Sequence, residues 1–195
     1  MNAPDDAVPA SPSLIRRRRP FLAPLWLLGL GAVLMLLGAV LYWNSANTTT
    51  IVVIRHAEKQ IGAISDAPLS PPGEQRAARL AQMLGDAETF GRVGKIYVTD
   101  TRRTQQTAAG VAQRLGIAPL VVAAQTDSAA LAWRALKENR GGVALIVGHS
   151  NTVPEIVRTL AHAQKVPAMG DEEFDTFYVV SVPTIGKASV LRMKY

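Results

Sequence analysis

The chain has 195 residues, no cysteine and a formal net charge of +6. The absence of cysteine excludes a disulfide framework, a thiolate nucleophile and a cysteine-ligated metal. Arg16–Arg19 supply four of the positive charges. The remaining excess is spread without interleaved aromatic side chains, which argues against nucleic-acid binding and favours small anionic substrates. The first 43 residues differ in composition from the rest, so roughly 150 residues remain for one globular domain.

The N-terminal segment predicts a membrane anchor. Residues 1–20 are rich in Pro and Ala and end in four arginines, so we expect a disordered basic tail. Residues 21–43 carry no charge, and a helix of that length crosses a hydrocarbon core of roughly 30 Å. This predicts a transmembrane helix or signal anchor in the inner (plasma) membrane. The arginines keep the tail cytoplasmic and direct the C-terminal domain to the periplasm or exterior. Polar residues 44–50 predict a linker.

Three other interpretations of the apolar run remain open. A cleaved signal peptide has a shorter apolar core and small residues at its cleavage site, and Asn44-Ser45-Ala46 matches that site poorly. Arg18-Arg19-Pro20-Phe21-Leu22 resembles a twin-arginine export signal, although the run is more hydrophobic than that class. A buried helix of the globular domain is the third interpretation, and the flanking arginines argue against it.

From residue 51 onward the pattern alternates between strand and helix. We expect strands at 51–54, 95–99, 120–123 and 143–147, and helices at 71–84, 103–115, 128–139 and from Thr152, where Thr152-x-x-Glu155 resembles a capping box. The β-rich runs 176–182 and 188–193 predict an antiparallel pair at a sheet edge. The fold class is therefore α/β, a three-layer α/β/α sandwich with a mostly parallel sheet, plus one N-terminal transmembrane helix.

Two histidines each follow an apolar strand: Arg55-His56 after the first and Gly148-His149 after the fourth. The ends of parallel strands converge on one crevice, so these side chains can meet there. A neutral imidazole is a good nucleophile toward phosphorus near pH 7. Guanidinium groups neutralise phosphate bidentately, and Arg55 with either Arg102 or Arg103 could form such a clamp. The pattern predicts a site for phosphoryl transfer.

Four motifs in this order resemble the histidine phosphatase superfamily, also called the phosphoglycerate mutase-like fold. They are Arg55-His56-Ala57-Glu58, in which alanine replaces the family's usual glycine, Pro68-Leu69-Ser70-x-x-Gly73, the segment from Thr99 to Ala108, and Val147-Gly148-His149-Ser150. The resemblance covers residues 51–195, and each motif is weak alone. Their common order and spacing make the resemblance specific.

The resemblance assigns roles to residues of this chain. By this resemblance His56 is the nucleophile, and Arg55, Arg103 and His149 bind the phosphoryl group. The motif alignment selects Arg103 over Arg102. The family usually places an acid after its third strand, which makes Asp127 the candidate general acid. Asp127 also stands where a helix N-cap is expected, and capping is the role that we favour. Glu58 is the alternative acid and would line the pocket.

The resemblance implies a membrane-anchored phosphomonoesterase that works through a phosphohistidine intermediate. Its substrate would be a phosphorylated small molecule or phosphoprotein, such as a phosphorylated envelope sugar, and its membrane contact would be residues 21–43. We expect no cofactor, and arginines beside the histidines would repel a metal ion. The alternative is a catalytically inactive phosphate-binding or interaction domain of the same fold. The complete set of two arginines and two histidines favours the enzyme. A third histidine, His162, is expected to be a partly exposed helix residue.

Overall fold

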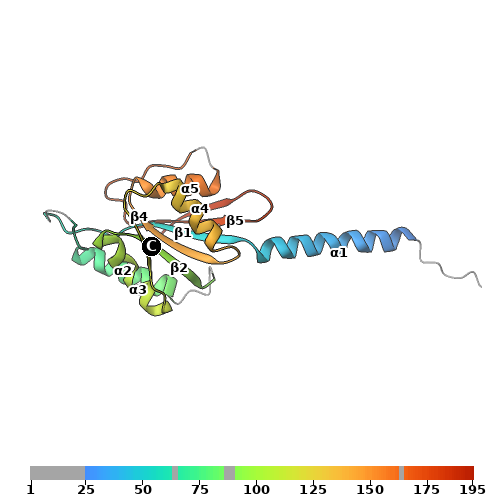
Figure 1. The fold of residues 1–195 in the computed structure, drawn as a ribbon, viewed down its shortest axis with the longest axis horizontal. Coiled ribbons are helices and arrows are strands. Elements are labelled where there is room, and N and C mark those ends of the chain that lie inside the picture. Colours follow the sequence, from blue (N-terminus) through green and yellow to red (C-terminus); the bar gives the residue numbers. More distant parts are fainter. Residues whose placement is uncertain (1–24, 63–65, 86–90, 163–164) are drawn as a thin grey trace, which may run out of the picture. The chain divides into compact units, whose positions relative to one another are not determined.

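A computed structural model of the chain describes residues 25–62, 66–85, 91–162 and 165–195. The chain divides into two compact units, residues 1–39 and 40–195. The tail predicted at residues 1–20, with Arg16–Arg19, lies outside the described residues. Elements are labelled in Figure 1.

The first described element is the helix α1 (Leu25–Ala46). Its residues from Trp26 onward are long and apolar enough to cross a membrane, and none in the most apolar stretch is buried, unlike a core helix. A signal sequence passes the same test of length and composition. The length and composition of α1 therefore fit a membrane anchor and an export signal equally well.

The predicted linker at 44–50 is wrong at both ends. Helix α1 continues to Ala46 and strand β1 (Thr49–Arg55) starts two residues after Asn47. The side chain of Asn47 donates to the carbonyl of Trp43 at 2.7 Å, and Thr48 Oγ1 donates to the carbonyl of Asn44 at 2.9 Å. These bonds satisfy carbonyls that a helix end leaves free, so polar residues extend and close the helix instead of interrupting it.

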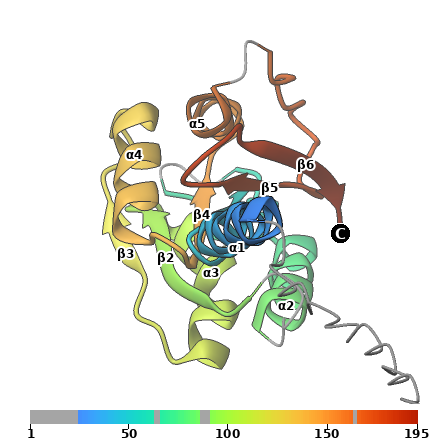
Figure 2. The same cartoon turned by 90° about the vertical axis from the view of Figure 1, so that its right-hand side faces the viewer.

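The domain is built on one six-stranded sheet in the order β3-β2-β4-β1-β5-β6. The strands other than β1 are β2 (Val93–Thr99), β3 (Leu120–Val122), β4 (Val143–Gly148), β5 (Thr176–Val182) and β6 (Ser189–Lys194). The first four strands in the sheet order run parallel, and β5 and β6 add an antiparallel edge. Figure 2 shows the sheet from β3 at one edge to β6 at the other. The mostly parallel sheet and its antiparallel edge are confirmed.

Helices cover both faces of the sheet. Figure 1 shows α4 (Ser128–Glu138) and α5 (Thr152–Ala161) above it and α2 (Pro71–Gly85) and α3 (Arg102–Leu115) below. Strand β1 is buried on both sides because its side chains alternate between two cores: Val52 and Ile54 pack toward α2 and α3, and Ile51 and Val53 toward α4 and α5. The predicted three-layer sandwich is confirmed.

The capping box predicted at Thr152 is not formed. Helix α5 begins at Thr152, and the N-cap position is Asn151, which makes no side-chain cap bond. The hydroxyl of Thr152 instead accepts from the backbone N–H of His149 at 2.9 Å. The threonine therefore fixes the loop that carries the second histidine and leaves the helix start open.

The site is positioned by neighbouring strands β1 and β4. The helix after β1 covers one face of the sheet and the helix after β4 covers the other, so the chain diverges between them. Such a switch point opens a crevice at the carboxyl ends of the strands. Arg55 pairs with Gly148 in the strand register, and the N–H of His56 donates to the carbonyl of Gly148 at 2.9 Å. Both histidines therefore enter this crevice.

Candidate active site

A cavity of about 460 Å³ lies at the carboxyl ends of the parallel strands. Its described lining residues are Arg55, His56, Lys59, Arg103, Ala124, Gln125, His149, Ser150, Asn151 and Asp171. The four residues on which the sequence argument depended most are thus brought together. Arg102, Asp127 and Glu58 are not among the described lining residues.

His56 is buried and held in one tautomer. Its Nδ1 lies 2.7 Å from the carbonyl of Ala57, so Nδ1 carries the proton and Nε2 keeps its lone pair. The N–H of Ala57 donates in turn to Thr107 Oγ1 at 3.0 Å, which fixes this turn. Burial, together with the nearby charges of Arg103, His149 and Arg55 and against the hydrogen bond to Ala57, lowers the pKa of His56 to about 3. The imidazole is neutral at pH 7 and ready to attack through Nε2.

His149 faces His56, with ring centroids 5.4 Å apart and planes at 65°. Its Nδ1 lies 3.4 Å from Arg103 Nη2, and its Nε2 lies 3.1 Å from Thr99 Oγ1. Arginine can only donate, so Nδ1 accepts and Nε2–H donates to the threonine. Burial, then the charges of Arg103 and Arg55, lower the pKa of His149 to about 4. Because both of its nitrogens are engaged, geometry distinguishes His149 from the nucleophile.

Arg55 is held by a segment far away in sequence. Its Nη1 donates to the carbonyls of Gly170, Asp171 and Glu173 at 2.8, 2.9 and 3.3 Å. Its guanidinium carbon lies 4.0 Å from the centre of the Phe174 ring, within the range of a cation–π contact. The Nε of Arg55 is buried without a partner among the described residues. Burial lowers the pKa of Arg55, and the acidic side chains of the segment oppose this.

Arg103 supplies the second cation, from the first turn of α3. Its Nη1 lies 3.8 Å from Asp66 Oδ1, and its Nε is buried without a described partner. Arg102 is exposed, and its backbone N–H donates to both carboxylate oxygens of Asp66 at 2.9 Å. The structure therefore places Arg103, and not Arg102, in the cavity lining.

The motifs around the site also have structural roles. Gln106 Oε1 accepts from the N–H of Leu69 at 2.8 Å, which ties α3 to the segment before α2. A Cβ on Gly73 would lie 2.2 Å from the carbonyl of Glu58, so the start of α2 can approach the loop after His56 only with glycine at this position. These contacts fix the loop that positions the nucleophile.

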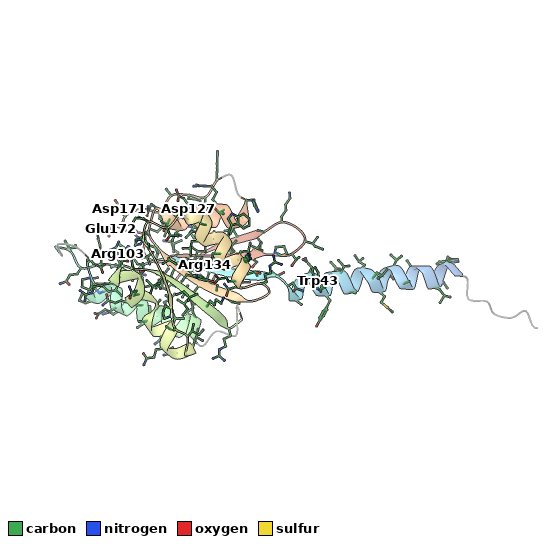
Figure 3. All side chains as sticks on the ribbon, in the orientation of Figure 1. Trp43, Arg103, Asp127, Arg134, Asp171 and Glu172 are labelled. Atoms are coloured by element: carbon green, nitrogen blue, oxygen red, sulfur yellow. The ribbon has the colours of Figure 1, made fainter. Side chains whose placement is uncertain are left out.

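Both acids proposed from the sequence have partners outside the described cavity lining. Glu58 receives three hydrogen bonds from Arg76, at 2.7 to 2.9 Å. Burial raises the pKa of Glu58, but these bonds, a backbone hydrogen bond and the charges of Arg76 and Arg55 together lower it overall. Asp127 caps α4, where its oxygens accept from the N–H groups of Ala129 and Ala130. Among the described lining residues the carboxyl group belongs to Asp171. Figure 3 shows Asp171 and Arg103 at the same end of the domain.

The two low histidine pKa values predict an unusual titration. An ordinary histidine has a pKa near 6.5, so both imidazoles should stay neutral from pH 8 down to pH 5. Their ring signals can be followed in ¹⁵N-histidine-labelled full chain in detergent micelles, because the sequence holds three histidines. Signals are assigned by His→Gln substitution. A titration midpoint near 6.5 for His56 would contradict the buried, arginine-flanked geometry.

Comparison with known proteins agrees with this geometry. The family model of the histidine phosphatase superfamily (branch 1) matches residues 51–127. A comparison with curated proteins gave no match. The protein histidine phosphatase SixA complexed with tungstate is 17% identical, with a TM-score of 0.61, over 74% of this chain and 96% of that one.

Two further solved structures share the fold. A mycobacterial glucosyl-3-phosphoglycerate phosphatase complexed with VO3 is 16% identical, with a TM-score of 0.50, over 72% of this chain and 99% of that one. A phosphoserine phosphatase mutant from Entamoeba histolytica, in complex with phosphoserine, is 15% identical, with a TM-score of 0.50, over 70% and 95%. The domain after α1 therefore has the fold of these phosphatases, and its residues 51–127 match the superfamily's model.

Proposed function

We propose that the chain is a membrane-anchored phosphomonoesterase that transfers the phosphoryl group of its substrate to His56 and then to water. The anchor is α1, and the catalytic domain lies on the side of the membrane opposite to the tail. This assignment gives the shared fold an activity, a nucleophile and a location in this chain.

The proposal rests on two arginine N–H groups that have no described hydrogen-bond partner and belong to side chains that line the same cavity as His56. The Nε groups of Arg55 and Arg103 are buried without a described partner, and both side chains line the cavity that contains His56. Buried donors in native proteins are nearly always paired, so this pair calls for an acceptor with several oxygens. A phosphoryl group meets that need, and a phosphoryl group bound in this cavity would share it with His56.

The reaction proceeds in two balanced steps. In the first, His56 Nε2 forms a bond to phosphorus, the bond to the leaving oxygen breaks, and that oxygen takes up a proton. In the second, water attacks the phosphohistidine, inorganic phosphate leaves, and the imidazole returns to its neutral form. Arg55 and Arg103 neutralise the charge on the phosphoryl oxygens throughout. Because His56 is already neutral, it needs no base to activate it.

The substrate class follows from where the cavity opens. Strand β1 starts two residues after Asn47 at the end of α1 and delivers His56 at its other end, after seven residues. At ~3.3 Å per residue the strand carries the chain about 20 Å from its first residue to the cavity. We infer that the substrate is a water-soluble phosphomonoester or phosphoprotein. The phosphatases with similar folds act, by their names, on phosphohistidine, a phosphorylated sugar derivative and phosphoserine.

A panel of phosphomonoesters tests the proposal. The full chain in detergent should release phosphate from at least one of p-nitrophenyl phosphate, phosphosugars, phosphoserine and a phosphohistidine peptide, and the His56→Ala variant from none. Tungstate binding without turnover on any substrate would instead support the alternative, a phosphate-binding domain that has lost catalysis. The convergence of His56 and His149 with both arginines favours the enzyme.

The source of the leaving-group proton gives a paired prediction. We expect Asp127→Asn to change kcat on alkyl phosphates and on p-nitrophenyl phosphate equally little, and Asp127→Ala to cost about 1 kcal/mol of stability as a lost cap. We expect Asp171→Asn to slow alkyl phosphates at least ~10-fold more than p-nitrophenyl phosphate, because only poor leaving groups need an acid. The measurements are kcat on both substrates and thermal melting. A substrate-selective loss in Asp127→Asn would restore Asp127 as the acid.

The membrane topology is tested by reporter fusions. A C-terminal reporter enzyme that is active only after export should be active, and a reporter active only in the cytoplasm should not, because the arginines at 16–19 hold the tail inside. Replacing these four arginines by glutamine should reduce the export-dependent signal. A mature protein that begins near Asn47 would show that the segment is a cleaved signal.

A further inference from the structure

A second cavity, of about 410 Å³, opens at the other end of the domain from the candidate active site. It is lined by Asn47, Thr49, Trp133, Leu136, Lys137, Arg140, Val182, Pro183 and Thr184. Thr49 is the first residue of β1, whereas Arg55 at the end of the same strand lines the catalytic cavity. This cavity therefore adjoins the end of the chain that leaves α1.

The charge of this cavity is positive and uncompensated. Lys137 and Arg140 line it, no described lining residue is acidic, and neither cation forms an ion pair with a residue that the structure describes. The acid between them in sequence, Glu138, accepts instead from Lys95, Arg134 and Tyr97. Two free cations on one cavity wall fit an anion.

The rim of the cavity suits a lipid–water interface. Trp133 is 46% exposed, and Ile185, in the turn between β5 and β6, is 57% exposed. Trp side chains concentrate at membrane interfaces, where one end of the ring is in contact with apolar groups and the other with water. Ile185 directly follows Thr184, which lines the cavity, and adds an exposed apolar side chain next to it in the chain.

Hydrogen bonds attach this face to the end of the anchor. The side chain of Asn44 accepts from the N–H of Ile185 at 2.8 Å and donates to its carbonyl at 3.0 Å. Thr184, which lines the cavity, donates to the carbonyl of Asn47 at 3.3 Å. The last turn of α1 and the β5–β6 turn are thus joined, so the cavity is held close to where α1 ends.

We propose that this cavity binds the phosphate of an anionic phospholipid in the membrane that α1 spans. Lys137 and Arg140 contact the headgroup phosphate, and Trp133 and Ile185 rest in the interface. This rests on the proposed anchor. The bound headgroup gives the domain a contact with the lipid surface in addition to α1.

The test measures which lipids stay with the full chain. Protein reconstituted in vesicles of phosphatidylcholine with phosphatidylglycerol is extracted in mild detergent, and the lipids that copurify are quantified. Phosphatidylglycerol should be enriched over its share in the vesicles for the wild-type chain, and this enrichment should disappear in Lys137→Gln/Arg140→Gln. Arg79→Gln/Arg158→Gln removes two exposed cations from other helices, α2 and α5, and should keep the enrichment. Brominated phosphatidylglycerol should quench the fluorescence of Trp133, which is the part of the tryptophan signal that is lost in Trp133→Phe.

Each other outcome has a defined meaning. Equal enrichment in Lys137→Gln/Arg140→Gln, or none in the wild-type chain, overturns the lipid site. Binding of soluble glycerol phosphate by the wild-type chain without any enrichment of phosphatidylglycerol shows that the occupant is a soluble phosphate, and also overturns it. Flotation of the wild-type chain with pure phosphatidylcholine vesicles reports on the anchor, and phosphoenzyme formation reports on catalysis. Failure of the anchor or of the enzyme is therefore separated from failure of the headgroup site.

Discussion

The His56→Ala variant is expected to form no phosphoenzyme and to lose turnover by about 10⁴-fold or more, the scale of loss when a covalent nucleophile is removed. His56 Nε2 is the ring nitrogen at this site that keeps a free lone pair, since Nδ1 is bound to Ala57 and both nitrogens of His149 are engaged. The measurement is a brief incubation with labelled substrate, followed by an acid or base quench. A phosphohistidine is lost in acid and survives in base.

Two variants make this result specific. His162→Ala should form the adduct normally, because His162 ends α5 and packs on Trp133, with ring centroids 5.6 Å apart, outside the catalytic cavity. His149→Ala should still be phosphorylated, more slowly, because it loses a residue that lines the cavity and holds Arg103. Retention of the adduct in His56→Ala, or its loss in His149→Ala with normal phosphorylation in His56→Ala, would reverse the assignment of the two histidines.

The fold could be predicted because its signals are local. Strand β1 is a run of β-branched residues bounded by polar ones, and α2 starts at a Ser-Pro pair. The hydrophobic pattern and the residues that start or end an element therefore both predict the observed elements. The errors occurred where a polar side chain had two possible partners. Thr152 bonds to His149 and not to its own helix, and Asn47 closes α1 where a linker was expected.

The site could be predicted for the residues that follow strands, and for Arg103 through the motif alignment. Arg55, His56 and His149 stand directly after or at the end of a buried strand, and topology alone brings them together. The clamp on Arg55 could not be found, because backbone carbonyls of residues 170–173 have no sequence signature and the segment is irregular. The same holds for Asp171, which reaches the cavity from this segment.

The partners of Glu58 and Asp127 were equally hidden from the sequence. Glu58 pairs with Arg76, one turn into α2, and the pairing depends on how closely α2 approaches the loop after His56. Asp127 fits both an acid and a cap by position, and only the bonds to Ala129 and Ala130 show which donors it meets. In both cases the role depends on a distance of a few ångströms that residue spacing does not determine.

The second large effect is expected at Arg103. Losing one preorganised charged donor costs on the order of 2 to 4 kcal/mol of transition-state stabilisation, or about 30- to 1000-fold in kcat/KM. Arg103→Ala should show this loss on p-nitrophenyl phosphate, because the side chain lines the cavity and reaches His149. Arg102→Ala is the matched control and should stay within about threefold, since its contact to Asp66 is made by the backbone and survives the substitution.

Arg103→Ala should also change the pH dependence. The charge of Arg103 lowers the pKa of both His56 and His149, so its removal raises both values. Protonation of His56 blocks attack, and the acid limb of kcat/KM should therefore move to higher pH in Arg103→Ala and stay in place in Arg102→Ala. Arg103→Lys should restore the acid limb, because the positive charge returns, but only part of the rate, because an ammonium group lacks the planar fork of donors. A larger loss of kcat/KM in Arg102→Ala, with an unmoved acid limb in Arg103→Ala, would assign the clamp to Arg102.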